Sequence, residues 1–219
     1  MAGFNELDKV AKEHGVGQGS GDFMKLEEGD NKVRIVSEYE VLSKYWLGGR
    51  SVINVGDDKG VEYPKKDGKG NDVRSSAKFL MYVIDRADGK IKMLESNWTI
   101  VSGIRDLSVD EDYAFDEESG LPGYDLKIKK TKTGPNPTDV EYNVLPSPTK
   151  TPLTDDEKAD VEALTPMSTV VDRFKKKEME RIQAGEFEQY GVKFTGEKKY
   201  AGDEEKPADE IDPDDIPFD

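Results

Sequence analysis

Apolar and polar residues alternate with a period of two over several short segments in the first two-thirds of the chain. The clearest segment is 78–85, and an Asp-Gly turn at 86–89 leads from it into a partner segment at 90–95. A period of two places successive side chains on opposite faces of a sheet, and an Asp-Gly turn favours a tight hairpin. The same pattern predicts further strands at 31–41, 44–46, 51–55, 124–129 and 140–145.

Helical spacing of apolar residues occurs in three other places. Asn97 is a suitable N-cap for a short helix, on which we expect Trp98 to belong to the core. Two more helices are predicted at 155–164 and 166–183. An amphipathic helix either packs on its own domain or binds a partner, and packing is the commoner outcome. The second of these helices carries its apolar arc at Met167, Val170, Val171, Phe174 and Ile182.

About five strands with one short helix between them, paired mostly with near neighbours in sequence, indicate a mainly β architecture. We predict a five-stranded antiparallel barrel with C-terminal helical segments. The polar and glycine-rich stretches set the boundaries. The expected organisation is a flexible arm at 1–21, a barrel domain at 22–150, a helical extension at 151–184, a linker at 185–202 and a disordered acidic tail at 203–219.

The composition limits the kinds of catalytic and metal site that the chain can form. The chain has no cysteine, which excludes disulfides and thiolate ligands, and His14 is its only histidine. No catalytic set or phosphate-binding glycine loop occurs, so we expect neither enzymatic activity nor a cofactor. The N-terminus has no secretory signal pattern, and the longest apolar run, 79–84, is too short to cross a bilayer. We therefore expect a soluble, cytoplasmic protein.

Charge is segregated along the chain. The formal net charge is −15, yet residues 44–92 hold eleven Lys or Arg and seven Asp or Glu, and 127–132 add four lysines. The acidic residues concentrate at 106–118 and in the tail. We expect a solvated loop at 106–118, with a weak divalent-cation site as the alternative. Because charge acts mainly within about 10 Å, the basic segments remain able to attract an anion.

The last seventeen residues carry nine acidic side chains and one lysine, a net charge of −8. Such a segment buries too little apolar surface to order itself, so it is predicted to be disordered. It is either a solubilising arm or a docking peptide, and its apolar tip favours docking. The candidate docking residues are Asp214, Asp215, Ile216, Pro217 and Phe218, followed by Asp219.

Aromatic residues lie among cations on the predicted strands. Aromatic faces accept unstacked bases and nearby cations hold phosphates, a composition typical of single-strand binders. The alternative is that these aromatics pack in the core or across strands. Tyr45 and Trp46 are adjacent, so they face opposite sides and at most one of them lies in a given groove. The candidate nucleic-acid-binding residues are Lys44, Tyr45, Trp46, Arg50, Lys65, Lys66, Lys78, Tyr82, Lys92, Lys127, Lys129, Lys130 and Tyr142.

The order of several segments carries a family resemblance. An early strand ends near Trp46 and Arg50, and the segments 79–85, 94–104, 123–128 and 142–146 follow before the helical region and the acidic tail. This order resembles the phage single-stranded-DNA-binding proteins related to the helix-destabilising protein of the T-even phages. The tail tip is similar to the C-terminal peptide of bacterial single-stranded-DNA-binding proteins, although Asp219 moves the terminal carboxylate away from Phe218.

The resemblance implies an OB-fold and sequence-independent binding of single-stranded DNA in replication, recombination and repair. It also implies a phage protein in the host cytoplasm, whose tail recruits a polymerase, helicase or primase. Relatives often carry a zinc ribbon, but the corresponding loop at 63–71 has no Cys or His. We therefore expect no zinc, and expect Lys65, Lys66, Lys69 and Arg74 to contact phosphates instead. The alternatives are an acidic, DNA-mimicking interaction or inhibitor protein and an RNA-binding OB protein.

Overall fold

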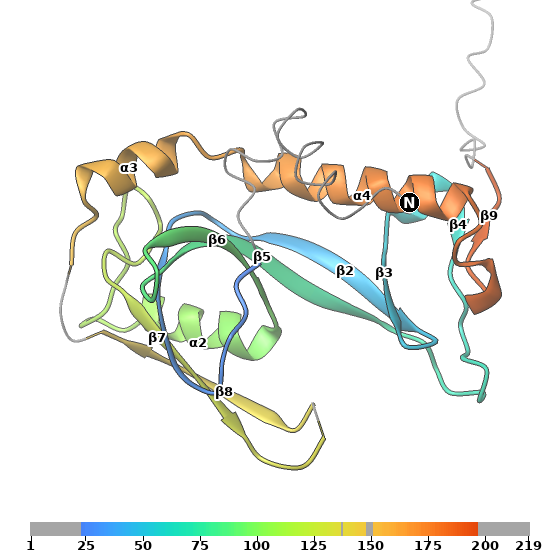
Figure 1. The fold of residues 1–219 in the computed structure, drawn as a ribbon, viewed down its shortest axis with the longest axis horizontal. Coiled ribbons are helices and arrows are strands. Elements are labelled where there is room, and N and C mark those ends of the chain that lie inside the picture. The colour runs from blue at the N-terminus through green and yellow to red at the C-terminus, as the bar shows by residue number, and fades with distance from the viewer. Residues whose placement is uncertain (1–22, 137, 148–150, 197–219) are drawn as a thin grey trace, which may run out of the picture.

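The computed structural model describes residues 23–136, 138–147 and 151–196 (Figure 1). The arm expected at 1–21 and the acidic tail expected at 203–219 lie outside these residues. The described chain is mainly β, with one large antiparallel sheet and three α-helices. None of the helices in this part of the chain is long and apolar enough to span a membrane.

The large sheet has the strand order β3-β2-β5-β1-β7-β8, and β6 pairs with the remaining edge of β5. The strands predicted at 51–55, 78–85, 90–95, 124–129 and 140–145 are confirmed with small shifts of their ends. The single strand predicted at 31–41 is wrong: the first strand ends at Ile35, and residues 40–41 begin the strand predicted at 44–46. The strands are β1 (Gly29–Ile35), β2 (Glu40–Leu47), β3 (Arg50–Ile53), β5 (Ser75–Asp85), β6 (Lys90–Ser96), β7 (Leu126–Lys132) and β8 (Val140–Pro146).

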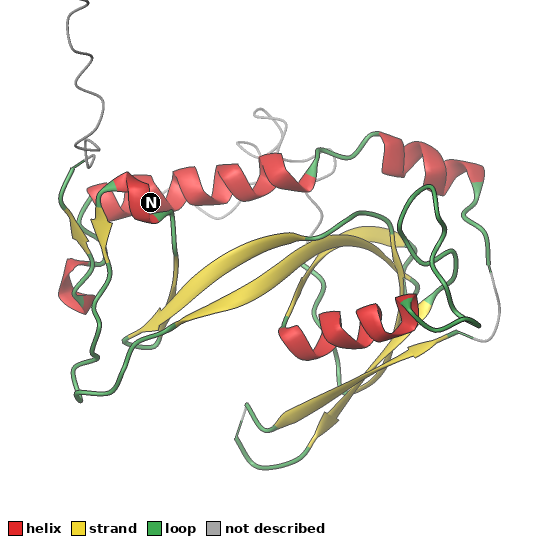
Figure 2. Cartoon of the chain, turned by 180° about the vertical axis from the view of Figure 1, so that it is seen from behind, coloured by secondary structure: helices red, strands yellow, loops and turns green. Residues whose placement is uncertain are grey.

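The predicted five-stranded antiparallel barrel is not confirmed, because the sheet stays open between β6 and β8 among the described residues. Helix α2 (Trp98–Ser108) lies between the β5–β6 strands and the β7–β8 hairpin (Figures 1 and 2). Gly103 lets it approach β8 closely, since a Cβ there would lie 3.0 Å from Cγ2 of Val144. The predicted cap is confirmed: the Asn97 side chain accepts a hydrogen bond of 3.1 Å from the Ile100 N–H.

Two hydrophobic clusters lie on opposite faces of the sheet. Beneath α2, the residues of one face include Ile35, Met81 and Val83. Helix α4 (Met167–Gln183) lies along the other face, as Figure 1 shows. The expectation that α4 packs on its own domain is confirmed, because its buried side chains meet those of β2, β5 and β6. That second cluster comprises Leu42, Leu80, Tyr82, Ile84, Met93, Met167, Val170, Val171 and Val36.

The segment expected to be a linker at 185–202 is folded over its described part. Phe187 is only 1 % exposed and packs with Val192 against Val52 and Ile182 in a third cluster. The same cluster buries Val61 and packs against Tyr63 at the start of the 63–71 loop. Small elements complete this region: η1 (Asp57–Lys59), η2 (Glu188–Tyr190), and the two-stranded sheet of β4 (Val61–Glu62) and β9 (Lys193–Phe194).

A buried ion-pair network fastens the first helix of the C-terminal extension, α3 (Asp155–Glu162), to the sheet. Asp125 lies 3.0 Å from both Arg34 and Arg86, and Arg86 also pairs with Glu157 of α3. Burial raises the pKa of Asp125, but hydrogen bonds from Arg86 and Arg34 outweigh burial and lower this pKa below its ordinary value. The carboxylate is therefore charged at neutral pH, and its position depends on both arginines.

Candidate nucleic-acid interface

The ladder between β2 and β5 presents two different faces. Its register places Val41 opposite Phe79, Ser43 opposite Ala77, and Tyr45 opposite Ser75. Successive residues of a strand point to opposite faces, so Leu42, Lys44 and Trp46 belong to the other side. That other side carries α4, which packs on Leu42 and Leu80.

The face opposite Leu42 and Leu80 carries five less covered positions, which we call the open strip: Val41, Ser43, Tyr45, Ser75 and Ala77. At its Tyr45 end the strip borders the third cluster, to which α4 contributes Ile182. Val41 is 45 % exposed, Ser75 and Ala77 are exposed, and Ser43 and Tyr45 are half-buried. Three of the five side chains are serine or alanine. Because these side chains are short, a flat group can approach the backbone of the sheet along the strip.

Aromatic rings lie at both ends of the open strip. At one end, Tyr45 stacks on Tyr63 with ring centroids 4.3 Å apart and planes 19° apart. At the other end, the Phe79 ring lies 5.4 Å from Tyr39 and 6.0 Å from Trp98. Tyr39 is 52 % exposed and Trp98 is 60 % exposed. These exposed rings supply π-faces of the kind on which unpaired bases stack.

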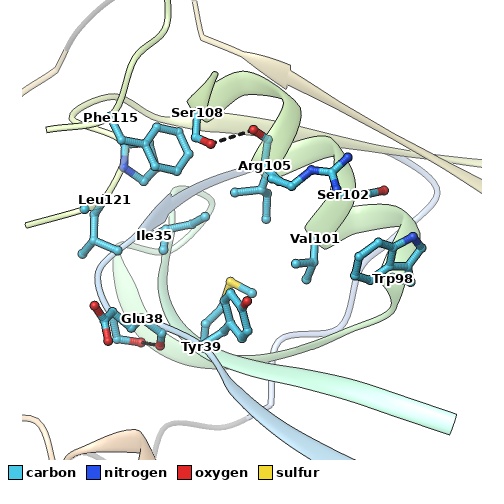
Figure 3. Close-up of a pocket in the computed structure, with 15 residues that line it drawn as sticks. Ile35, Glu38, Tyr39, Trp98, Val101, Ser102, Arg105, Ser108, Phe115 and Leu121 are labelled. Atoms are coloured by element: carbon cyan, nitrogen blue, oxygen red, sulfur yellow. Dashed lines mark hydrogen bonds between the residues drawn. The ribbon is translucent and has the colours of Figure 1, made fainter. Parts of the chain in front are cut away.

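Beyond Tyr39 and Trp98 the open strip continues into a pocket of about 720 Å³ (Figure 3). Its walls come from the end of β1, the β1–β2 connection, one side of α2 and the loop before β7. The apolar lining includes Ile35, Met81, Val101 and Ile104. Met81 is on the same face of β5 as Ala77 and Phe79, so a single strand runs from the open strip into the pocket.

Cations flank this surface without forming a continuous track. Arg105 of α2 has its guanidinium carbon 6.0 Å from the Trp98 ring centroid and pairs with Asp106 at 2.8 Å. At the opposite end, Arg50 is exposed and lies 6.0 Å from the Tyr190 ring centroid. Lys65 is exposed, whereas Lys66 pairs with Asp72 at 2.6 Å. These exposed ion pairs are weak and can exchange for phosphate contacts.

The structure separates the two adjacent aromatics Tyr45 and Trp46, as their adjacency predicted. Tyr45 lies on the open strip, whereas Trp46 points to the opposite face of β2, shared with Leu42 and Lys44, and is 70 % exposed at the end of the strand. Lys44 and Lys78 also lie on that side, where Lys44 pairs with Glu95. These three residues therefore do not share a groove with Tyr45.

The structure removes Tyr82 from the candidate surface. It is 1 % exposed beneath α4, because the sheet alternation places it beside Leu80 and Ile84 in the second cluster. Burial raises the pKa of its hydroxyl, which has no hydrogen-bond partner among the described residues.

The Lys92 ammonium is already paired with two carboxylates. It lies 2.7 Å from Asp85 and 2.8 Å from Asp88, and these hydrogen bonds raise the pKa of Lys92.

The remaining candidates belong to the β7–β8 hairpin. Lys127 pairs with Asp30 at 3.1 Å, and the Lys130 ammonium donates a hydrogen bond of 2.8 Å to the Leu26 carbonyl. Lys129 is exposed, and Tyr142 is half-buried against the cluster beneath α2. The structure thus distributes the predicted residues over separate surfaces rather than one groove.

Sequence reasoning missed Tyr39, Trp98 and Arg105 as candidate site residues, and the expectation that Trp98 belongs to the core is wrong. Trp98 is the first residue of α2, so its ring extends past the helix end while Ile100, Val101 and Ile104 make the buried contacts. Tyr39 precedes β2 and keeps the period-two spacing of Val41, Ser43 and Tyr45. That spacing was the sequence signal that places Tyr39 on the same face as Tyr45, but it does not indicate which face of the sheet stays uncovered.

The proposed docking residues Asp214, Asp215, Ile216, Pro217 and Phe218 lie outside the described residues. Within the described ranges, no group of three or more His, Asp or Glu side chains is arranged to hold a metal ion. No protein-family model matches this chain, and a comparison with curated proteins finds no significant relative. A functional assignment therefore depends on the chemistry of the surface itself.

Proposed function

We propose that the chain is a non-catalytic protein that binds single-stranded DNA without sequence preference. The observation that carries this proposal is the open strip, a row of mostly small residues with the exposed Tyr39 and Trp98 rings at one end and the half-buried Tyr45–Tyr63 stack at the other. Base stacking on aromatic rings contributes about 1 to 3 kcal/mol per base and accepts any base. A duplex hides its base faces, so this surface favours an unpaired strand.

The strand arrangement supports an OB-like reading of the sheet. The five strands β6, β5, β1, β7 and β8 are neighbours in that order, and α2 lies in sequence between β6 and β7. We infer a partly open OB-like sheet whose first long connection, between β1 and β5, contributes β2 and β3. OB-folds commonly use such connecting loops to bind oligonucleotides.

We further propose two roles for the acidic tail, both argued from its sequence. Ile216, Pro217 and Phe218 form an apolar tip that docks replication or recombination proteins, with a polymerase, helicase or primase as candidates. The tail also competes with DNA for the flanking cations, because a tethered anion has a high effective concentration. Removing residues 203–219 then tightens DNA binding at low salt and weakens recruitment of the partner.

Fluorescence anisotropy with labelled oligo-dT, a matched duplex and a matched RNA, at two salt concentrations, tests the proposal. We expect salt-sensitive binding of the single strand and much weaker binding of the duplex. Absence of binding at low salt, also after removal of residues 203–219, overturns it and favours an acidic, DNA-mimicking interaction protein. Preference for the RNA favours the RNA-binding alternative, because only contacts to the 2′-hydroxyl separate the two.

A further inference from the structure

We propose that one base of the bound strand leaves the stack and enters the pocket between Tyr39 and Trp98. This inference rests on the proposed function and adds to it a defined subsite. The pocket volume of about 720 Å³ falls in the range of sites that hold small organic ligands. Tyr39 and Trp98, which contact Phe79 at the end of the open strip, also line the pocket, so a bound strand that lies on the strip adjoins it.

The lining is suited to a flat, uncharged group. Ile35, Met81 and Val101 form an apolar interior, and the Tyr39 and Trp98 rings stand at the entrance (Figure 3). Both rings are more than half exposed, although each also contacts Phe79. Covering them with a base removes apolar surface from water and adds stacking on a π-face.

The electrostatics favour a base over a phosphate in the interior. Glu38 is part of the pocket lining. The loop at 110–118, which contributes Phe115 to the lining, contains six acidic residues. A phosphate placed there meets like charge, whereas a base is neutral. Arg105 lies at the Trp98 side of the entrance, where its guanidinium holds the phosphate that precedes or follows the inserted base.

The pocket offers few donors to read base edges. The hydroxyls of Ser37, Ser102 and Ser108 donate to the backbone carbonyls of Glu38, Thr99 and Arg105, respectively. Their protons are therefore engaged within the protein. Because these donors are engaged, the subsite recognises a base by its shape and by stacking. It therefore accepts different bases, and binding stays independent of sequence.

Tryptophan emission provides the first test, because the chain contains only Trp46 and Trp98. In a Trp46→Phe variant, we expect saturating oligo-dT to quench the remaining Trp98 emission. In the matched Trp98→Phe variant, the remaining Trp46 lies on the face of β2 opposite the open strip, so its emission should change little. Trp98→Ala should weaken the affinity about 5- to 150-fold, which corresponds to the loss of one stacking ring.

A second pair of variants separates entry into the pocket from stacking at its rim. Ser102→Phe fills the pocket from α2 and leaves both entrance rings in place, so it should weaken binding about as much as Trp98→Ala. Thr99→Phe adds the same ring to an exposed position of α2 outside the pocket and should leave the affinity unchanged. Thermal unfolding of each variant shows whether the fold is retained.

The outcomes distinguish this inference from the function on which it rests. Tight single-strand binding with unquenched Trp98 and wild-type affinity of Trp98→Ala overturns the inserted base and leaves the proposed function standing. Equal affinities of folded Ser102→Phe and Thr99→Phe have the same consequence. Failure of the wild-type chain to bind any single strand overturns both.

Discussion

The two faces of the β2–β5 ladder have almost opposite chemistry, although their residues alternate along the same two strands. One face places Leu42 and Leu80 at 1 % and 0 % exposure beneath α4. The other leaves Val41, Ser75 and Ala77 uncovered. The difference shows that α4 decides which residues serve stability and which stay available to a ligand.

The largest expected effect concerns the buried network behind the covered face. Asp125→Asn leaves Arg34 and Arg86 without their shared carboxylate, so we expect a loss of about 3 to 5 kcal/mol in the free energy of unfolding. Because the native pKa of Asp125 is lowered, its stabilisation is present above the ordinary carboxyl pKa and lost as the pH falls through the native value.

Urea unfolding of the wild type and Asp125→Asn from pH 7 to pH 2 measures this dependence. We expect the gap between the two proteins to narrow below about pH 4, near the pKa of an unperturbed Asp. A gap that stays constant over this range contradicts the role given to the carboxylate.

A matched pair of truncations compares the two faces directly. Leu80→Ala opens a cavity beneath α4 and should cost about 2 to 5 kcal/mol of stability, whereas Val41→Ala on the open strip should cost less than about 1 kcal/mol. Chemical denaturation of both variants measures the difference. Similar losses at both positions contradict the difference in burial beneath α4 between Leu80 and Val41.

Adjacent aromatics provide the corresponding test of binding. Tyr45→Ala removes a ring from the open strip and should weaken single-strand binding by about 1 to 3 kcal/mol. Trp46→Ala removes a more exposed ring from the opposite face and should change the affinity little. Anisotropy titrations with oligo-dT compare them, and a larger loss for Trp46→Ala places the bound strand on the opposite face of β2 instead.

Tyr82→Phe tests whether a ring buried beneath α4 contributes to stability or to DNA binding. Its hydroxyl is buried without a partner among the described residues, so its removal should be neutral or stabilise the protein by about 1 kcal/mol. DNA affinity should not change, because the ring lies beneath α4. Loss of affinity without loss of stability restores Tyr82 as a contact residue.

The smallest expected effect is on salt dependence. Arg50 lies at the Tyr45 end of the open strip, since it pairs with Leu47 across the β2–β3 hairpin. Arg50→Gln should lower the slope of log affinity against log salt by about 0.7, the value for one phosphate contact on a single strand. Lys129→Gln on the distant β7–β8 hairpin is the control, and equal changes for both variants contradict the position of the strand.

The sequence by itself determined the elements, because strand alternation, helical spacing, the Asp-Gly turn and the Asn97 cap depend on neighbouring residues only. It also determined that Tyr45 and Trp46 face opposite sides. Only the tertiary structure decided that α4 covers the side of Tyr82, that α2 packs closely on β8, and that Phe187 joins a core. These outcomes depend on contacts between residues about 40 to 140 positions apart, which no local pattern encodes.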